Sequence, residues 1–150
     1  MPASVRHADH AGLKRVAVFG GADGLGIVLG IIAGLIVSHQ PARAVWVAAV
    51  SGGLAEFFSM ANGQRISDSG SGWAAALAIG TTSFAGCAIP AIPYSFSSGT
   101  TALALALGLC AAVAAVISWA RPEHGVLAIL ETFGLLIVTG VACGLAGWLL

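Results

Sequence analysis

Five apolar runs, each close to the length that crosses a lipid bilayer, take up almost all of this 150-residue chain. A membrane-spanning helix needs about 20 predominantly apolar residues. Helices also pair their backbone N–H and C=O groups internally, which is necessary because the hydrocarbon core contains no water to bond them. Hydrophobic residues make up 58% of the chain and charged residues 8%, against about 25% charged in a soluble domain. The sequence therefore predicts an all-α integral membrane protein with five transmembrane helices.

Polar turns rich in glycine, proline and serine separate the apolar runs. We expect residues 1–15 to form a cytoplasmic N-terminal tail and residues 16–150 to form one transmembrane domain. The expected helices cover about 16–37, 44–63, 73–89, 100–120 and 125–150. No strand alternation and no soluble domain is visible in the sequence.

The basic residues predict the orientation of the chain. With five spans, most of them fall on the N-terminal side of the membrane: Arg6, Lys14, Arg15, Arg65 and Arg121. Arg43 alone falls on the other side. The positive-inside rule then places the N-terminus in the cytoplasm and the C-terminus outside. Because the chain is compact and shows no organellar targeting stretch, we expect a prokaryotic inner (cell) membrane.

Several classes of function are excluded by composition. Formal net charge is zero, so the chain has no electrostatic footprint for nucleic acid. The three cysteines lie inside apolar runs and form no paired motif. We interpret them as small core residues, not as disulfide partners or zinc ligands. We expect neither enzymatic activity nor a bound cofactor.

The first apolar run, Val16–Leu35, contains a single acid, Asp23. A charged side chain in mid-membrane costs about 2.5–3.5 kcal/mol on insertion scales, so such residues usually have a function. Asp23 shares a helical face with Gly26, Gly30 and Gly34, and glycine at every fourth position lets another helix approach. We predict that Asp23 faces protein and that these glycines form a helix-packing or dimer interface. The alternative for Asp23 is a structural polar contact between helices.

Two further acids, Glu56 and Glu131, lie inside later runs at a similar depth. At 1.5 Å per residue, Asp23 and Glu56 are each about 11 Å from the cytoplasmic end of their helices, and Glu131 is about 9 Å in. The sequence predicts three acids from three helices at one level. Glu131 is a candidate path-lining residue. The alternative is an acid near a helix start that favours the dipole and reaches water.

Met60 lies one helical turn after Glu56 and brings a thioether to the same face. Carboxylates with a soft sulfur ligand suit Fe²⁺ or Mn²⁺ better than Mg²⁺ or Ca²⁺. We therefore predict that Asp23, Glu56 and Met60 are metal ligands. The alternatives are a helix–helix hydrogen bond or a proton site for Glu56, and ordinary core packing for Met60.

Three segments resemble the vacuolar iron transporter family: FGGADGLGIVLGIIAGL, GGLAEFFSMANGQRIS and SFAGCAIPAIPY. They are similar to that family's first helix, its second helix with a Ser-Met-x-x-Gly core, and its proline-interrupted third helix. The resemblance implies a five-helix homodimer that moves Fe²⁺, and often Mn²⁺, out of the cytoplasm in exchange for protons. It also implies a path at the dimer interface that uses Asp23, Glu56 and Met60.

Two features differ from the well-known eukaryotic members of that family. Their path Glu lies about two turns before the Met, whereas Glu56 lies one turn before Met60. They also insert a long acidic hairpin between the second and third helices. Here only the segment 64–72 stands there, with Asp68 as its single acid, so the chain resembles a short form without the cytoplasmic metal-binding hairpin.

The sequence thus favours a secondary transporter that exports Fe²⁺ or Mn²⁺ by proton antiport. Five helices cannot divide into two equal halves, so a two-fold homodimer is the natural symmetric arrangement. The expected partners are a second copy, the metal ions and the lipid bilayer. Two alternatives stay open: a non-transporting membrane interaction protein, and a proton-coupled carrier of another solute.

Overall fold

The structure is a computed structural model that describes residues 3–67, 72–121 and 126–149. Within these ranges the chain is helical and contains no strand. Its elements are α1 (Ala3–Val37), α2 (Ala42–Ser67), α3 (Gly72–Ala91), the 3-10 helix η1 (Ile92–Ser95), α4 (Gly99–Ala120) and α5 (Val126–Leu149). Five helices are long and apolar enough to cross a membrane. The expected all-helical architecture with five such helices is confirmed.

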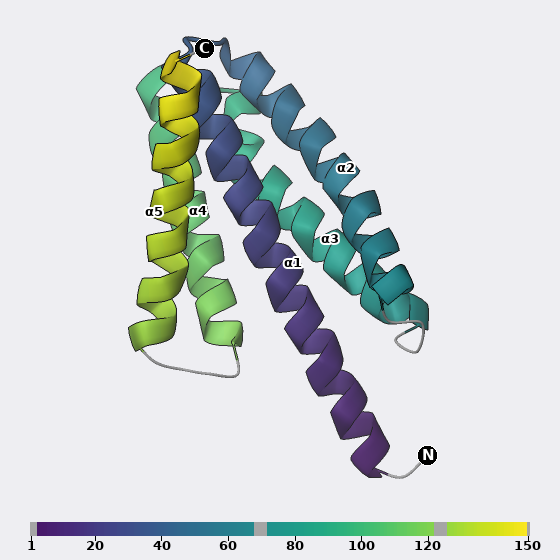
Figure 1. The fold of residues 1–150 in the computed structure, drawn as a ribbon. Coiled ribbons are helices and arrows are strands. Elements are labelled where there is room, and N and C mark those ends of the chain that lie inside the picture. Colours follow the sequence, from purple (N-terminus) through teal and green to yellow (C-terminus); the bar gives the residue numbers. More distant parts are fainter. Residues whose placement is uncertain (1–2, 68–71, 122–125, 150) are drawn as a thin grey trace.

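The ends of α1 and α2 differ from those expected. α1 begins at Ala3 and not near residue 16, so the expected tail is largely helical. Between Ala3 and Arg15 only Gly12 weakens a helix, and a single glycine is tolerated there. Figure 1 shows these first turns extending past the other helices. α2 likewise continues through Gly63 to Ser67. The expected limits at residues 125 and 150 lie outside the described residues.

A tight cap turns the chain between α1 and α2. The backbone N–H of Gln40 donates to the Leu35 carbonyl at 2.8 Å, and that of His39 donates to the Ile36 carbonyl at 3.0 Å. His39 has a φ of +58°. This left-handed residue and its paired bonds form a Schellman-type helix end. The next helix can therefore start at Ala42, directly after Pro41.

α1 lies between two pairs of helices (Figure 1). Its largest contacts are with α3 and then with α5, whereas α2 packs mainly on α3. The N- and C-termini lie at opposite ends of the bundle, as an odd number of crossings requires. This arrangement leaves α1 in contact with all four other α-helices and makes it the natural place for a functional side chain.

Glycines bring α1 and α3 into backbone contact. A Cβ added to Gly24 would collide with the carbonyl oxygen of Ser83, and one added to Gly86 would collide with the carbonyl oxygen of Gly21. Small residues at such crossings let helix backbones approach closely inside a membrane. The contact fixes α1 against α3 one residue away from Asp23.

Small residues also form the buried face of α4. Its fully or nearly buried positions repeat at every fourth residue: Ala102, Ala106, Cys110 and Ala114. They meet a core formed from larger side chains of α1 and α2, namely Leu25, Val28, Ile32 and Val45. The outward faces of the bundle remain apolar, with Trp119, Leu127 and Ile137 more than half exposed. Helices that are hydrophobic on every side are typical of membrane spans.

Candidate metal-binding site

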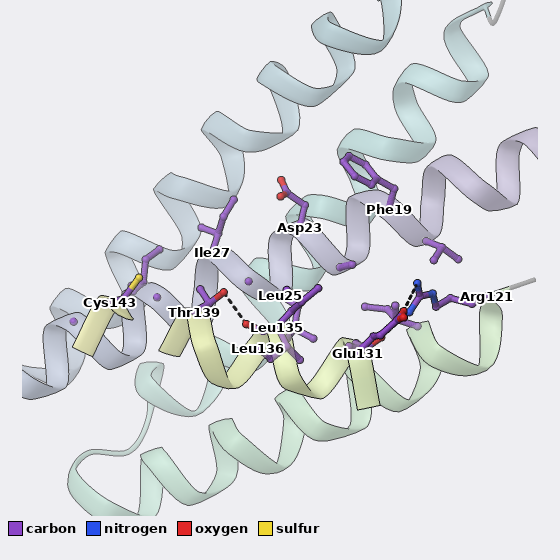
Figure 2. A pocket seen from close by; sticks show the side chains of 18 of the residues that line it. Phe19, Asp23, Leu25, Ile27, Arg121, Glu131, Leu135, Leu136, Thr139 and Cys143 are labelled. Atoms are coloured by element: carbon purple, nitrogen blue, oxygen red, sulfur yellow. Dashed lines mark hydrogen bonds and ion pairs between the residues drawn. The ribbon is translucent and has the colours of Figure 1, made fainter. Parts of the chain in front are cut away.

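Asp23 lies in the middle of α1, inside the membrane-spanning segment Ala11–Val37. Its neighbours Gly24 and Leu25 are buried, while Asp23 itself is half-buried. In Figure 2 its side chain points away from Leu135 and Leu136 of α5. The carboxyl is therefore held on a rigid helix but stays open on one side.

Glu56 of α2 reaches this carboxyl. The two carboxyls are near enough to interact, and Glu56 is half-buried as well. Two ionised carboxylates repel each other, and a cation between them would remove this repulsion. The structure thus brings together the two acids that were predicted to lie at one depth.

Met60 lies one turn after Glu56 on α2 and is half-buried. Cys87 of α3 is fully buried, and its thiol donates a hydrogen bond to the Ala49 carbonyl at 3.3 Å. Cys87 is also near enough to Glu56 for the two to interact electrostatically. This neighbour could not be predicted from the sequence, because Cys87 resembles any other small residue in an apolar run.

The described residues contain no group of three or more His, Cys, Asp or Glu side chains arranged to hold a metal ion. The site in one copy is therefore a two-carboxylate pair with a thioether one turn away. A cation held by this pair would complete its shell with water or with groups from elsewhere.

Glu131 does not join the carboxyl pair. Its side chain is 65% exposed and forms an ion pair with Arg121 at 3.5 Å. Arg121 also donates a hydrogen bond to the Thr132 hydroxyl at 3.2 Å. Figure 2 shows this ion pair at one end of α5, away from the Asp23 carboxyl. The sequence analysis used Arg121 only to predict the orientation of the chain in the membrane. It did not predict the ion pair between Arg121 and Glu131.

A groove of about 1260 Å³ runs between α1 and α5. It passes Asp23 and extends from Arg121 and Glu131 at one end to Cys143 at the other (Figure 2). Arg15 of α1 also lines it. Glu131 therefore shares a groove with Asp23, although their carboxyls do not meet. Most of the lining between these two ends is aliphatic.

The glycine stripe beside Asp23 has two different environments. A Cβ on Gly30 would lie 2.9 Å from the Cys143 sulfur, and one on Gly34 would lie 3.6 Å from the Cys143 carbonyl oxygen. A Cβ on Gly26 would meet nothing within 4 Å. Gly30 and Gly34 thus pack against α5 of the same chain, and Gly26 alone stays uncovered.

Comparison with known proteins returned no relatives: no protein-family model, no curated protein and no solved structure matches the chain.

Proposed function

We propose that this protein is a secondary transporter that exports Fe²⁺ or Mn²⁺ from the cytoplasm in exchange for protons. The observation that carries the proposal is the contact between the Asp23 and Glu56 carboxyls. They come from two helices that are each long and apolar enough to cross a membrane. Intramembrane acids that meet in pairs are typical of ion and proton pathways.

Proton coupling follows from the chemistry of this pair. A carboxylate must lose its proton before it coordinates a metal, so metal and protons compete for the same oxygens. Metal that enters from a neutral cytoplasm would displace protons from these carboxyls. Protons from a more acidic far side would then displace the metal. One site can therefore couple the two movements without a separate proton channel.

The proposal includes a homodimer. Because α5 covers Gly30 and Gly34, we place the dimer contact on the α1–α2 face that carries Asp23 and Glu56, and not along the whole glycine stripe. A two-fold axis beside this face would bring a second carboxyl pair to the first. Four carboxylates and two thioethers would then provide the shell that a single copy lacks.

Proton flux in liposomes tests the proposed activity. Purified protein is reconstituted with a pH-sensitive dye inside the vesicles, and Fe²⁺ or Mn²⁺ is added outside. We expect metal-dependent movement of protons, and none on addition of Mg²⁺ or in protein-free vesicles. Failure of both Fe²⁺ and Mn²⁺ to move protons would leave a non-transporting interaction protein or a carrier of another solute.

Orientation gives a separate prediction. Arg15, Arg65 and Arg121 lie at one end of the bundle and Arg43 lies near the other, so we propose that the N-terminus is cytoplasmic. A reporter fused to the C-terminus should then be active only outside the cytoplasm. A C-terminal reporter that is active in the cytoplasm would contradict the proposed orientation.

Met60→Leu should weaken the binding of Fe²⁺ more than that of Mn²⁺. The change keeps a similar volume and removes only the sulfur, and such swaps usually cost less than about 1.5 kcal/mol of stability. We expect the KM for Fe²⁺ to rise about tenfold, with an unchanged unfolding temperature. Equal KM values for the variant and the wild type would indicate that Met60 is a packing residue and not a metal ligand.

A further inference from the structure

The groove between α1 and α5 is long. Along α1 it runs from Arg15 to Leu35, which is about 30 Å at 1.5 Å per residue. Its volume of about 1260 Å³ exceeds the range of about 300–1,000 Å³ that is usual for small-molecule pockets. The length matches the hydrocarbon thickness of a bilayer, about 30 Å. The groove therefore suits an extended, chain-like ligand.

The lining of the groove is segregated by polarity. Its middle is formed by aliphatic side chains of α1 and α5, among them Ile27, Ile31, Leu135 and Leu136. Asp23 lies along this stretch, and the Arg121–Glu131 ion pair lies at the end where α4 finishes and α5 starts, as Figure 2 shows. An apolar channel with a charged mouth is complementary to an amphipathic ligand.

Two arginines that line the groove could bind an anionic group. Arg15 of α1 is exposed and lines the groove together with Arg121 of α4. Arg121 is held in place from α5, by the Glu131 carboxylate at 3.5 Å and the Thr132 hydroxyl at 3.2 Å. A guanidinium carries five N–H donors in a planar fork that matches phosphate oxygens. The Glu131 and Thr132 contacts hold this guanidinium at the groove that it lines.

We propose that this groove is a binding site for an anionic phospholipid, with the phosphate on Arg15 and Arg121 and an acyl chain along the α1–α5 seam. Basic pockets between membrane helices are known to bind acidic lipid headgroups. A helix of a second copy is the alternative occupant, and the test below separates it from a lipid. The bound chain would also cover the α5 side of Asp23. The proposal does not depend on metal transport.

Native mass spectrometry of the full chain in detergent tests this site. The protein is offered phosphatidylglycerol and phosphatidylcholine in equal amounts. We expect the wild type to retain phosphatidylglycerol preferentially. Arg15→Gln and Arg121→Gln should each weaken this retention about fivefold, and together about 25-fold. Each basic residue near an anionic lipid surface contributes about 1 kcal/mol of binding free energy, which is about fivefold in affinity.

Arg43→Gln is the matched control, because it removes the same charge at the other end of the bundle and does not line the groove. Loss of Arg121 could disturb the fold because it removes the ion pair with Glu131. Arg15→Gln keeps that ion pair, so this variant tests the lipid site by itself. Gly26→Phe should also reduce retention, since a side chain there would enter the groove, where a Cβ meets nothing within 4 Å.

Four results would overturn the proposal. The first is equal retention by the wild type and the Arg15→Gln/Arg121→Gln variant. The second is an equal loss in Arg43→Gln, which would indicate a general charge effect. The third is a groove occupied by a second copy, seen as a lipid-free dimer that Gly26→Phe dissociates. Added inorganic phosphate should not displace the lipid, because the apolar seam contributes to its binding; displacement would indicate a free-phosphate site.

Discussion

Replacing Asp23 with Asn, or Glu56 with Gln, is expected to abolish metal-driven proton movement in liposomes. Each change keeps the size of the side chain but removes the group that exchanges a proton for a cation. Loss of outer-shell partners alone costs about 10–100-fold in metal affinity or activity, so we expect a loss of at least about 100-fold for a ligand. Dye-reported proton flux with Fe²⁺ and Mn²⁺ measures the effect.

The double variant should be no worse than either single variant, because the two carboxyls form one site. Asp9→Asn is the matched control, since it removes an acid that lies before the span beginning at Ala11. Glu131→Gln shows whether the second acid of the groove belongs to the ion path. Wild-type flux in both Asp23→Asn and Glu56→Gln would reduce this pair to a structural contact.

Gly24→Ala is expected to destabilise the fold although it adds only one methyl group. The new Cβ would collide with the Ser83 carbonyl oxygen, which belongs to backbone and cannot rotate away. α1 and α3 would have to move apart, and overpacking of this kind typically costs about 1–3 kcal/mol. Unfolding of the purified protein in mixed micelles, followed by circular dichroism, measures the loss.

Gly26→Ala provides the control for Gly24→Ala. It lies on the same helix, makes the same chemical change and places its Cβ in open space. Because alanine favours a helix over glycine by about 1 kcal/mol, this variant should be as stable as the wild type or slightly more so. Equal stability of the two variants would mean that the α1–α3 contact is looser than it appears.

The number and type of the helices could be predicted because a bilayer imposes a length and an apolar composition that the sequence displays directly. Helix ends could not be predicted as well. Hydropathy marks where a helix leaves the hydrocarbon, not where its hydrogen bonds stop, so α1 extends back to Ala3 and α2 extends to Ser67. α3 even includes Pro90, although a proline has no N–H to donate to the carbonyl four residues before it; the helix ends one residue later, at Ala91.

Depth along the helices placed Asp23 and Glu56 at one level, and these two acids do interact. The surroundings of Glu131 and Gly30 could not. A helical repeat shows which residues share a face, but it does not show which helix covers that face. Depth placed Glu131 with the other acids, yet its position on α5 pairs it with Arg121. Likewise the glycine repeat identified a packing surface, and only the fold shows that Cys143 lies against it.

The backbone contact between α1 and α3 has a consequence for how such a sequence can diverge. Positions such as Gly24 and Gly86 leave no space for a Cβ, so substitution of these glycines by any other residue is disfavoured. The outer faces of α4 and α5 need only remain apolar, and any exchange among aliphatic residues satisfies a lipid-facing surface. Distant homologues should therefore keep the glycines of α1 and α3 while their last two helices become unrecognisable by residue identity. A search built on the first and third helices alone should reach further than one built on the whole chain.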